Sequence, residues 1–170
     1  MSRQDKQAQF QQQNKRRTPW LVMIAVLVLA GGVAAWALLP TGGQGEAVLK
    51  IVNGAVQVPQ SEFVDGVAKF YKVNGSRGEI SFFLVKSPDG IIRAAFDTCD
   101  VCYKEKKGYR QEGDNMVCNN CNQSFRSDLI NVVKGGCNPA PLQRELQGDK
   151  VVIQLAALEQ GSWYFNDHAK

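Results

Sequence analysis

Two pairs of cysteines constrain this chain more than any other feature of its sequence. Cys99 and Cys102 enclose two residues, as do Cys118 and Cys121, and fifteen residues separate the pairs. Each Cys-x-x-Cys pair can present two sulfur atoms from one tight turn, and the loop between the pairs lets the second turn fold over the first. Four thiolates arranged in this way suit zinc, a single iron or an iron–sulfur cluster. The spacing therefore predicts a metal centre.

A fifth cysteine, Cys137, lies between Gly135-Gly136 and Asn138-Pro139. A four-ligand site does not need this fifth cysteine. Cys137 can therefore be a ligand, a partner in a redox disulfide or a buried thiol without a role, and the sequence leaves these alternatives open. The two glycines would let the backbone approach a metal closely. The single histidine, His168, lies near the C-terminus, where a tail residue is the simpler interpretation than a ligand.

Two other interpretations of the cysteines also stay open. Two disulfides with one free thiol would suit an oxidising compartment, although closely spaced Cys-x-x-Cys pairs are uncommon as plain staples. A dithiol oxidoreductase uses the same motif at a helix N-terminus, and no such helical pattern follows either pair. The sequence contains no Ser-His-Asp set or phosphate-binding loop. We therefore expect a redox or metal-binding accessory protein rather than an enzyme.

Residues 20–39 contain no charged side chain and are almost entirely apolar. Twenty residues of helix span roughly 30 Å, the thickness of the bilayer core. This run therefore predicts a single transmembrane helix over 19–39 of the inner (cytoplasmic) membrane. Because residues 1–18 form a basic tail, the positive-inside bias places the N-terminus in the cytoplasm. The competing interpretation is a cleaved secretory signal, since Ala35-Trp36-Ala37 fits an Ala-x-Ala pattern. Both place the rest of the chain outside the cytoplasm.

The net charge of +4 comes from the N-terminal tail. Of 20 Lys and Arg and 16 Asp and Glu in the chain, residues 1–17 hold five and one, which leaves 15 of each for the remainder. The remainder is therefore neutral, and the basic balance gives no evidence for nucleic-acid binding.

Residues 40–46 form a Gly-rich linker, and residues 47–170 are expected to fold as one α+β domain, mostly antiparallel β, with Cys-x-x-Cys metal knuckles. Asn53-Gly54 separates two short β-type runs and predicts a hairpin between 47–52 and 55–58. A three-stranded antiparallel meander is predicted over 68–73, 79–86 and 91–96. Its middle strand is apolar on both faces and should be central.

Short helical turns are expected at 61–67, 127–133 and 156–160. Ser61 and Ser127 are the expected N-caps of the first two. A further strand is expected at Val151–Leu155. In the second cysteine turn, Asn122 follows Cys121 and tolerates the left-handed conformation often found there. Tyr103 holds the same place after Cys102 and fits it poorly, which predicts a first turn of different shape.

The sequence around the cysteines resembles the membrane iron–sulfur-containing, FtrD-like family over about residues 50–166. The resemblance is carried by four stretches: Phe96–Tyr103, Lys107–Gly113, Met116–Cys121 and Gly135–Pro139. It implies that an iron–sulfur cluster or iron is held by Cys99, Cys102, Cys118, Cys121 and Cys137. It also implies electron transfer or iron handling in the membrane, beside an iron-uptake permease. The alternative is a structural-zinc or disulfide-stapled interaction domain that docks a membrane partner.

Overall fold

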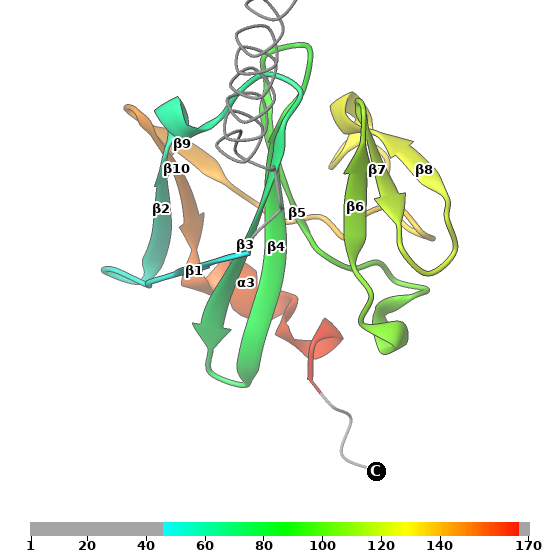
Figure 1. The fold of residues 1–170 in the computed structure, drawn as a ribbon. Helices are drawn as coiled ribbons and strands as arrows, with labels where there is room; N and C mark the ends of the chain where they lie inside the picture. The colour runs from blue at the N-terminus through cyan, green and yellow to red at the C-terminus, as the bar shows by residue number, and fades with distance from the viewer. Residues whose placement is uncertain (1–45, 167–170) are drawn as a thin grey trace, which may run out of the picture. The chain divides into compact units, whose positions relative to one another are not determined.

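The computed structural model describes residues 46–166, and this part of the chain is built mainly from three small sheets (Figure 1). The central sheet has the order β1-β3-β4-β5 and is formed by β1 (Ala47–Leu49), β3 (Ala68–Gly75), β4 (Gly78–Lys86) and β5 (Ile92–Phe96). Strands β3, β4 and β5 are antiparallel neighbours, whereas β1 pairs with β3 in parallel. The predicted meander and the mostly antiparallel β fold are confirmed.

A three-stranded sheet lies on each side of the central one (Figure 1). The first has the order β2-β10-β9 and consists of β2 (Ala55–Pro59), β10 (Lys150–Gln154) and β9 (Glu145–Gln147). The second has the order β6-β7-β8 and consists of β6 (Tyr109–Glu112), β7 (Asn115–Cys118) and β8 (Ser124–Arg126). The sequence predicted strand β10 but not the β6-β7-β8 sheet, whose strands are only three or four residues long.

The turn at Asn53-Gly54 forms as predicted, but the hairpin does not. Both residues have positive φ angles, and Val52 and Ala55 exchange two backbone hydrogen bonds of 2.9 and 3.1 Å. Beyond this pair β1 joins the central sheet and β2 joins β10. The prediction of paired strands is wrong because β2 buries Val56 and Val58 in the core, whereas β1 stays largely exposed.

The helical segments within residues 46–166 are short. They are α3 (Leu155–Gln160) and the 3-10 turns η1 (Gln60–Glu62), η2 (Tyr103–Glu105), η3 (Ser127–Leu129) and η4 (Ser162–Tyr164). The predicted N-caps at Ser61 and Ser127 are wrong: Pro59 and Arg126 hold these positions without a side-chain capping bond. The first N–H of each turn already donates to a backbone carbonyl of another segment, from Gln60 to Asp149 at 2.7 Å and from Ser127 to Asp114 at 2.8 Å.

No helix within residues 46–166 has the length and apolar character that crossing a bilayer requires. The predicted transmembrane helix over 19–39 lies outside the described residues, as do the basic tail at 1–18, His168 and most of the 40–46 linker.

Strand β4 separates two hydrophobic cores because its side chains alternate between the two faces of the central sheet. Ile80, Phe82 and Leu84 pack toward β2, β10 and α3, in the first core. Phe83 and Val85 pack on the opposite face, in the second core. All five are at most 1% exposed, so the prediction of a central strand covered on both faces is confirmed.

The second core contains two of the cysteines. Cys99 and Cys118 pack there with Tyr109 and Met116, which the β6-β7-β8 sheet contributes, and with Phe83 of the central sheet. These two thiols are therefore held by hydrophobic packing as well as by their own turns.

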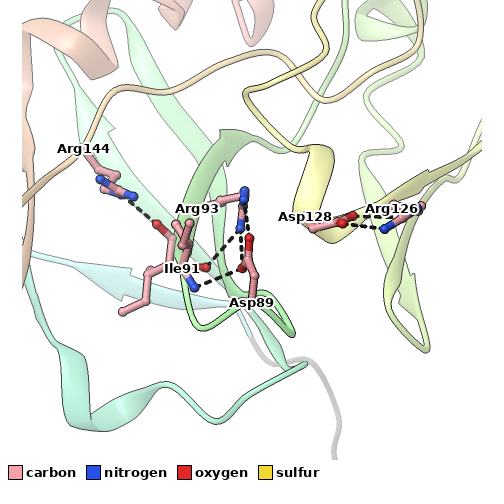
Figure 2. Close-up of polar contacts among 7 residues, drawn as sticks. Asp89, Ile91, Arg93, Arg126, Asp128 and Arg144 are labelled. Atoms are coloured by element: carbon pink, nitrogen blue, oxygen red, sulfur yellow. Dashed lines mark hydrogen bonds and ion pairs between the residues drawn. The ribbon is translucent and has the colours of Figure 1, made fainter.

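Polar contacts fix strand β5, from which the first cysteine pair continues. The guanidinium group of Arg93 donates to both carboxylate oxygens of Asp89 at 2.8 and 2.7 Å, across the turn that joins β4 to β5 (Figure 2). This bond holds the pKa of Asp89 at about 2. On the outer edge of β5, Arg144 Nε donates to the carbonyl oxygen of Ile92 at 2.7 Å (Figure 2). The strand is thus tied to the chain before it and to the segment that follows Cys137.

Candidate metal centre

The structure brings all five cysteines together, and none forms a disulfide. The sulfur atoms of Cys99, Cys102 and Cys118 all lie within 4.8 Å of one another. Those of Cys102, Cys121 and Cys137 form a second group by the same criterion. Cys102 belongs to both groups, and Cys137, whose role the sequence left open, lies at the site.

The first cysteine pair grows from the end of strand β5. The backbone N–H of Cys102 donates to the Cys99 sulfur at 3.2 Å, so the turn points an amide at a thiol that can carry negative charge. Tyr103 then enters the η2 turn, and the left-handed residue is Lys106, with a φ of 51°. This confirms the expected difference in shape after Cys102.

The second pair begins at the last residue of β7. The backbone N–H of Asn122 donates to the carbonyl oxygen of Cys118 at 2.9 Å, and the N–H of Cys118 donates to the carbonyl oxygen of Gln123 at 3.0 Å. Asn122 has a φ of 57°, the left-handed conformation that its place after Cys121 predicted. Backbone hydrogen bonds therefore close the turn.

Side chains of the second turn reach the first. Asn120 Nδ2 lies 3.4 Å from the Cys102 sulfur and donates to it, while Lys107 Nζ donates to Asn120 Oδ1 at 2.9 Å. The backbone N–H of Asn119 donates to the carbonyl oxygen of Gly108 at 3.0 Å. These bonds hold the two turns in register. All four residues lie in stretches that carry the family resemblance, but the sequence assigned none of them a role at the site.

Cys137 is held at the site by its backbone. Tyr109 Oη donates to the carbonyl oxygen of Cys137 at 2.6 Å, and the N–H of Ala140 donates to the carbonyl oxygen of Thr98 at 2.8 Å. The preceding Gly135 and Gly136 both have positive φ angles, 84° and 61°. These angles account for the two glycines, because no protein atom lies within 4 Å of a Cβ built on either.

The acidic residues that the sequence places near the cysteines make protein contacts of their own. Asp97 is largely buried and accepts a hydrogen bond from the backbone N–H of Tyr109 at 2.7 Å; its burial raises its pKa to about 7. Asp100 accepts a hydrogen bond from the Tyr164 hydroxyl, and Glu112 pairs with Arg110. None of the three acids belongs to either sulfur group.

The thiols of Cys118, Cys121 and Cys137 differ in how easily they ionise. Burial raises the pKa of Cys118 to about 11 and also raises the pKa of Cys137. The pKa of Cys121 is lowered, chiefly by a hydrogen bond from the backbone of Gln123, and this thiol is exposed. Because metals bind the thiolate form, a metal that binds Cys118 must displace its proton.

The distance between the Cys102 and Cys137 sulfur atoms fits a thiolate-bound metal. A tetrahedral ion with metal–sulfur bonds of about 2.3 Å needs sulfur atoms roughly 3.8 Å apart. The sulfur atoms of Cys102 and Cys137 are 3.9 Å apart. A cavity of about 10 Å³ has room for a single small sphere, and its lining contains Cys99, Cys102 and Cys118. The other lining residues are Thr98, Lys107, Gly108, Tyr109 and Asn120. An all-thiol donor set suits zinc or iron, as single ions or in a cluster.

A family model and a solved structure match parts of this chain. A family model described as "Membrane iron-sulfur containing protein FtrD-like" matches residues 63–165, more than half of the chain. No curated protein sequence matches. Among solved structures, a crystal structure of the quaternary ammonium Rieske monooxygenase CntA, in complex with the inhibitor MMV12, shares 16% identity at a TM-score of 0.38. That likeness covers 57% of this chain and 30% of that one, and it supports no statement about activity.

Proposed function

This chain belongs to the membrane iron-sulfur containing, FtrD-like family, and we propose that its five cysteines hold iron for electron transfer or iron handling beside a membrane iron permease. The observation that supports iron binding most directly is the convergence of five thiols, from three separate segments of the chain, within two overlapping groups. A plain four-thiolate zinc site would need only four of them.

The iron would be held as single ions or as an iron–sulfur cluster, and all five cysteines are proposed ligands. Bound to thiolates, iron would supply one-electron chemistry, because it is stable in two oxidation states. The residues of the chain have their own tasks. Cys99 and Cys118 place sulfur in a hydrophobic core that excludes water, whereas exposed Cys121 places sulfur at the surface.

Hydrogen bonds to the sulfur atoms support the same role. The backbone N–H of Cys102 donates to Cys99, and the Asn120 amide donates to Cys102. Such donors stabilise negative charge on sulfur, and they set the potential and affinity of an iron–thiolate centre. No described carboxylate or imidazole belongs to the sulfur groups, which favours a thiolate centre over an oxygen-ligated iron site.

The metal content of the full-length chain tests this function. The chain would be purified anaerobically in detergent, and its metals measured by mass spectrometry together with the visible absorption spectrum. We expect bound iron and thiolate-to-iron bands that bleach on reduction. A colourless chain with stoichiometric zinc, or one without metal, would refute the proposed function and favour a structural-zinc or thiol-only interaction domain.

The proposed place of this function is the cytoplasmic membrane, with a single helix over 19–39 and the cysteine domain outside the cytoplasm. The charge-free run at 20–39 and the membrane description of the family support it. Protease treatment of spheroplasts tests the topology. We expect the domain to be digested from the outside, whereas protection until lysis would contradict the proposed orientation. Co-purification with a membrane iron permease tests the partner.

A further inference from the structure

The sulfur atoms of the five cysteines form two groups of three, and the shared member is Cys102. We propose that the centre has two metal positions joined by the Cys102 thiolate, an inference that rests on the proposed iron–thiolate function. The inner position uses Cys99 and Cys118 with Cys102, and the outer position uses Cys121 and Cys137 with Cys102.

One metal position would leave part of the thiol set unused. A tetrahedral ion takes at most four donors, so it cannot bind all five thiols. In the structure, each group of sulfur atoms that lie within 4.8 Å of one another contains three thiols. Two positions use all five, because a thiolate sulfur has enough lone pairs to bond to two metals. Charge favours the same arrangement. Two divalent ions nearly neutralise five thiolates, so all five cysteines can bind in the thiolate form without a large uncompensated charge in a partly buried site.

The structure provides room for a metal at the inner position. The cavity of about 10 Å³ is lined by all three inner cysteines, Cys99, Cys102 and Cys118. Two of them are nearly inaccessible to solvent, at 1% and 2% exposure, and they pack in the second core. A metal held there would be shielded from water and would exchange slowly.

The outer position is open to solvent. Cys121 is exposed, and Cys102 and Cys137 are half-buried. The distance of 3.9 Å between the Cys102 and Cys137 sulfur atoms already matches one edge of a thiolate tetrahedron. As at the inner position, three protein ligands leave a tetrahedral metal one coordination site for an external ligand, and here the exposure of Cys121 makes that site accessible. The outer position is therefore the one that exchanges metal or meets a partner.

The contacts of the shared sulfur extend to the other two cysteine-bearing segments. Asn120 Nδ2 donates to Cys102, and Lys107 Nζ donates to the same amide through its oxygen. Cys102 belongs to the first turn, but its sulfur also contacts Asn120 in the second turn and Cys137 in a third segment. Its position in space therefore allows it to face both metal positions.

Titration of the full-length, metal-free chain with Co²⁺ under anaerobic, reducing conditions tests this arrangement. Thiolate-bound Co²⁺ has charge-transfer bands that count bound ions, and two Co²⁺ ions joined by one thiolate show magnetic coupling. We expect two equivalents per chain, the second weaker, with the electron paramagnetic resonance signal of the first diminishing as the second binds. Saturation at one equivalent, or two uncoupled ions, would overturn the proposal.

Three variants make the test specific. Replacing Cys121 and Cys137 together by Ser should leave one tightly bound, uncoupled Co²⁺, because the inner position keeps its ligands. Cys102→Ala should abolish the coupling, and coupling that persists in this variant would overturn the bridge. Ser124→Ala, an exposed change near the second turn, should still bind two coupled ions. The double variant changes no fully buried residue, so it should fold even where variants of Cys99 fail to do so.

The two proposals fail separately. A chain with reducible iron–thiolate bands but a single metal would overturn the two-position centre and leave the iron function standing. A chain that takes up two coupled Co²⁺ ions but is isolated with zinc and no iron would refute the iron function and support the bridged arrangement.

Discussion

The side-chain amide of Asn120 donates a hydrogen bond to the sulfur of Cys102 across 3.4 Å, although the two residues belong to different cysteine turns. Lys107 Nζ binds the oxygen of the same amide at 2.9 Å, so its positive charge polarises the N–H group toward the sulfur. This chain of two bonds links the first cysteine turn to the second. It also places a donor on the thiol that lies in both sulfur groups.

Replacing Asn120 tests whether this donor stabilises a metal-bound thiolate. Asn120→Ala should weaken Zn²⁺ or Co²⁺ binding about fivefold, equivalent to about 1 kcal/mol for a hydrogen bond at an exposed position. Asn120→Asp should weaken it further, because a carboxylate repels the thiolates. Competition with a chelator measures both. Equal affinities in the wild-type chain and both variants would show that the amide has no influence on the centre.

Gly108 tests the packing behind the first turn. It has a φ of 62°, and a Cβ at this position would collide with the Asp97 carboxylate. Gly113 has a similar φ of 56° but no atom within 4 Å of its would-be Cβ. Gly113→Ala should therefore cost only the backbone term of about 1 kcal/mol, and Gly108→Ala about 2 kcal/mol more. Urea unfolding measures both, and equal losses would contradict the role of the Asp97 contact.

The sequence predicted the parts of the fold that depend on local alternation. Strand β4 was readable because both of its faces are apolar, and the structure buries Phe82 and Phe83 on opposite sides of the central sheet. The partners of β1 and β2, which are β3 and β10, could not be predicted. The turn at Asn53-Gly54 specifies only that the chain reverses. Which strands β1 and β2 pair with depends on the side chains that they bury against segments distant in the sequence.

The candidate site was predictable to a similar degree. The spacing of the four paired cysteines indicated that they meet, and the left-handed Asn122 followed from its place after Cys121. The position of Cys137 could not be derived, because it depends on a tertiary contact: the N–H of Ala140 donates to the carbonyl of Thr98. The amide of Asn120 was visible in the motif, but its direction toward Cys102 depends on how the turns pack.

Thiol reactivity should report the inner and outer groups in the reduced, metal-free chain. Cys121 is exposed and has a lowered pKa, so it should react first with iodoacetamide. Cys118 is buried and its pKa is raised to about 11, so it should react far more slowly. Mass spectrometry of quenched samples gives the order. Faster labelling of Cys118 than of Cys121 would contradict the burial difference on which the two positions depend.

The hydroxyl of Tyr109 should stabilise the Cys137 segment. Tyr109→Phe keeps the ring contacts with Phe83 and Phe125 but removes the 2.6 Å bond to the Cys137 carbonyl, which should cost about 1 kcal/mol of stability. Tyr71→Phe is the matched control. The buried Tyr71 hydroxyl has no hydrogen-bond partner within the described residues, so its loss should be neutral or stabilising. Urea unfolding of both variants decides, and an equal effect of the two would count against the Cys137 anchor.

Asp97 should make the stability of the metal-free chain depend on pH. Its pKa is raised from 3.8 to about 7 by burial, so between these values the folded chain retains a proton that the unfolded chain has lost. The unfolding free energy should therefore fall as pH rises from about 4 to about 7 and then level off.

Asp97→Asn removes this ionisation, and its side-chain oxygen can still accept the hydrogen bond from the Tyr109 N–H. The variant should lose the part of the pH dependence that belongs to Asp97, so its stability relative to the wild-type chain should increase steadily between pH 4 and 7. Urea unfolding at several pH values, with reductant and chelator present, measures the difference. A difference that stays constant over this range would mean that the carboxyl group is ionised in the folded chain at acidic pH. The Tyr109 N–H would then be bound to a charged group throughout, and burial would not govern the ionisation of Asp97.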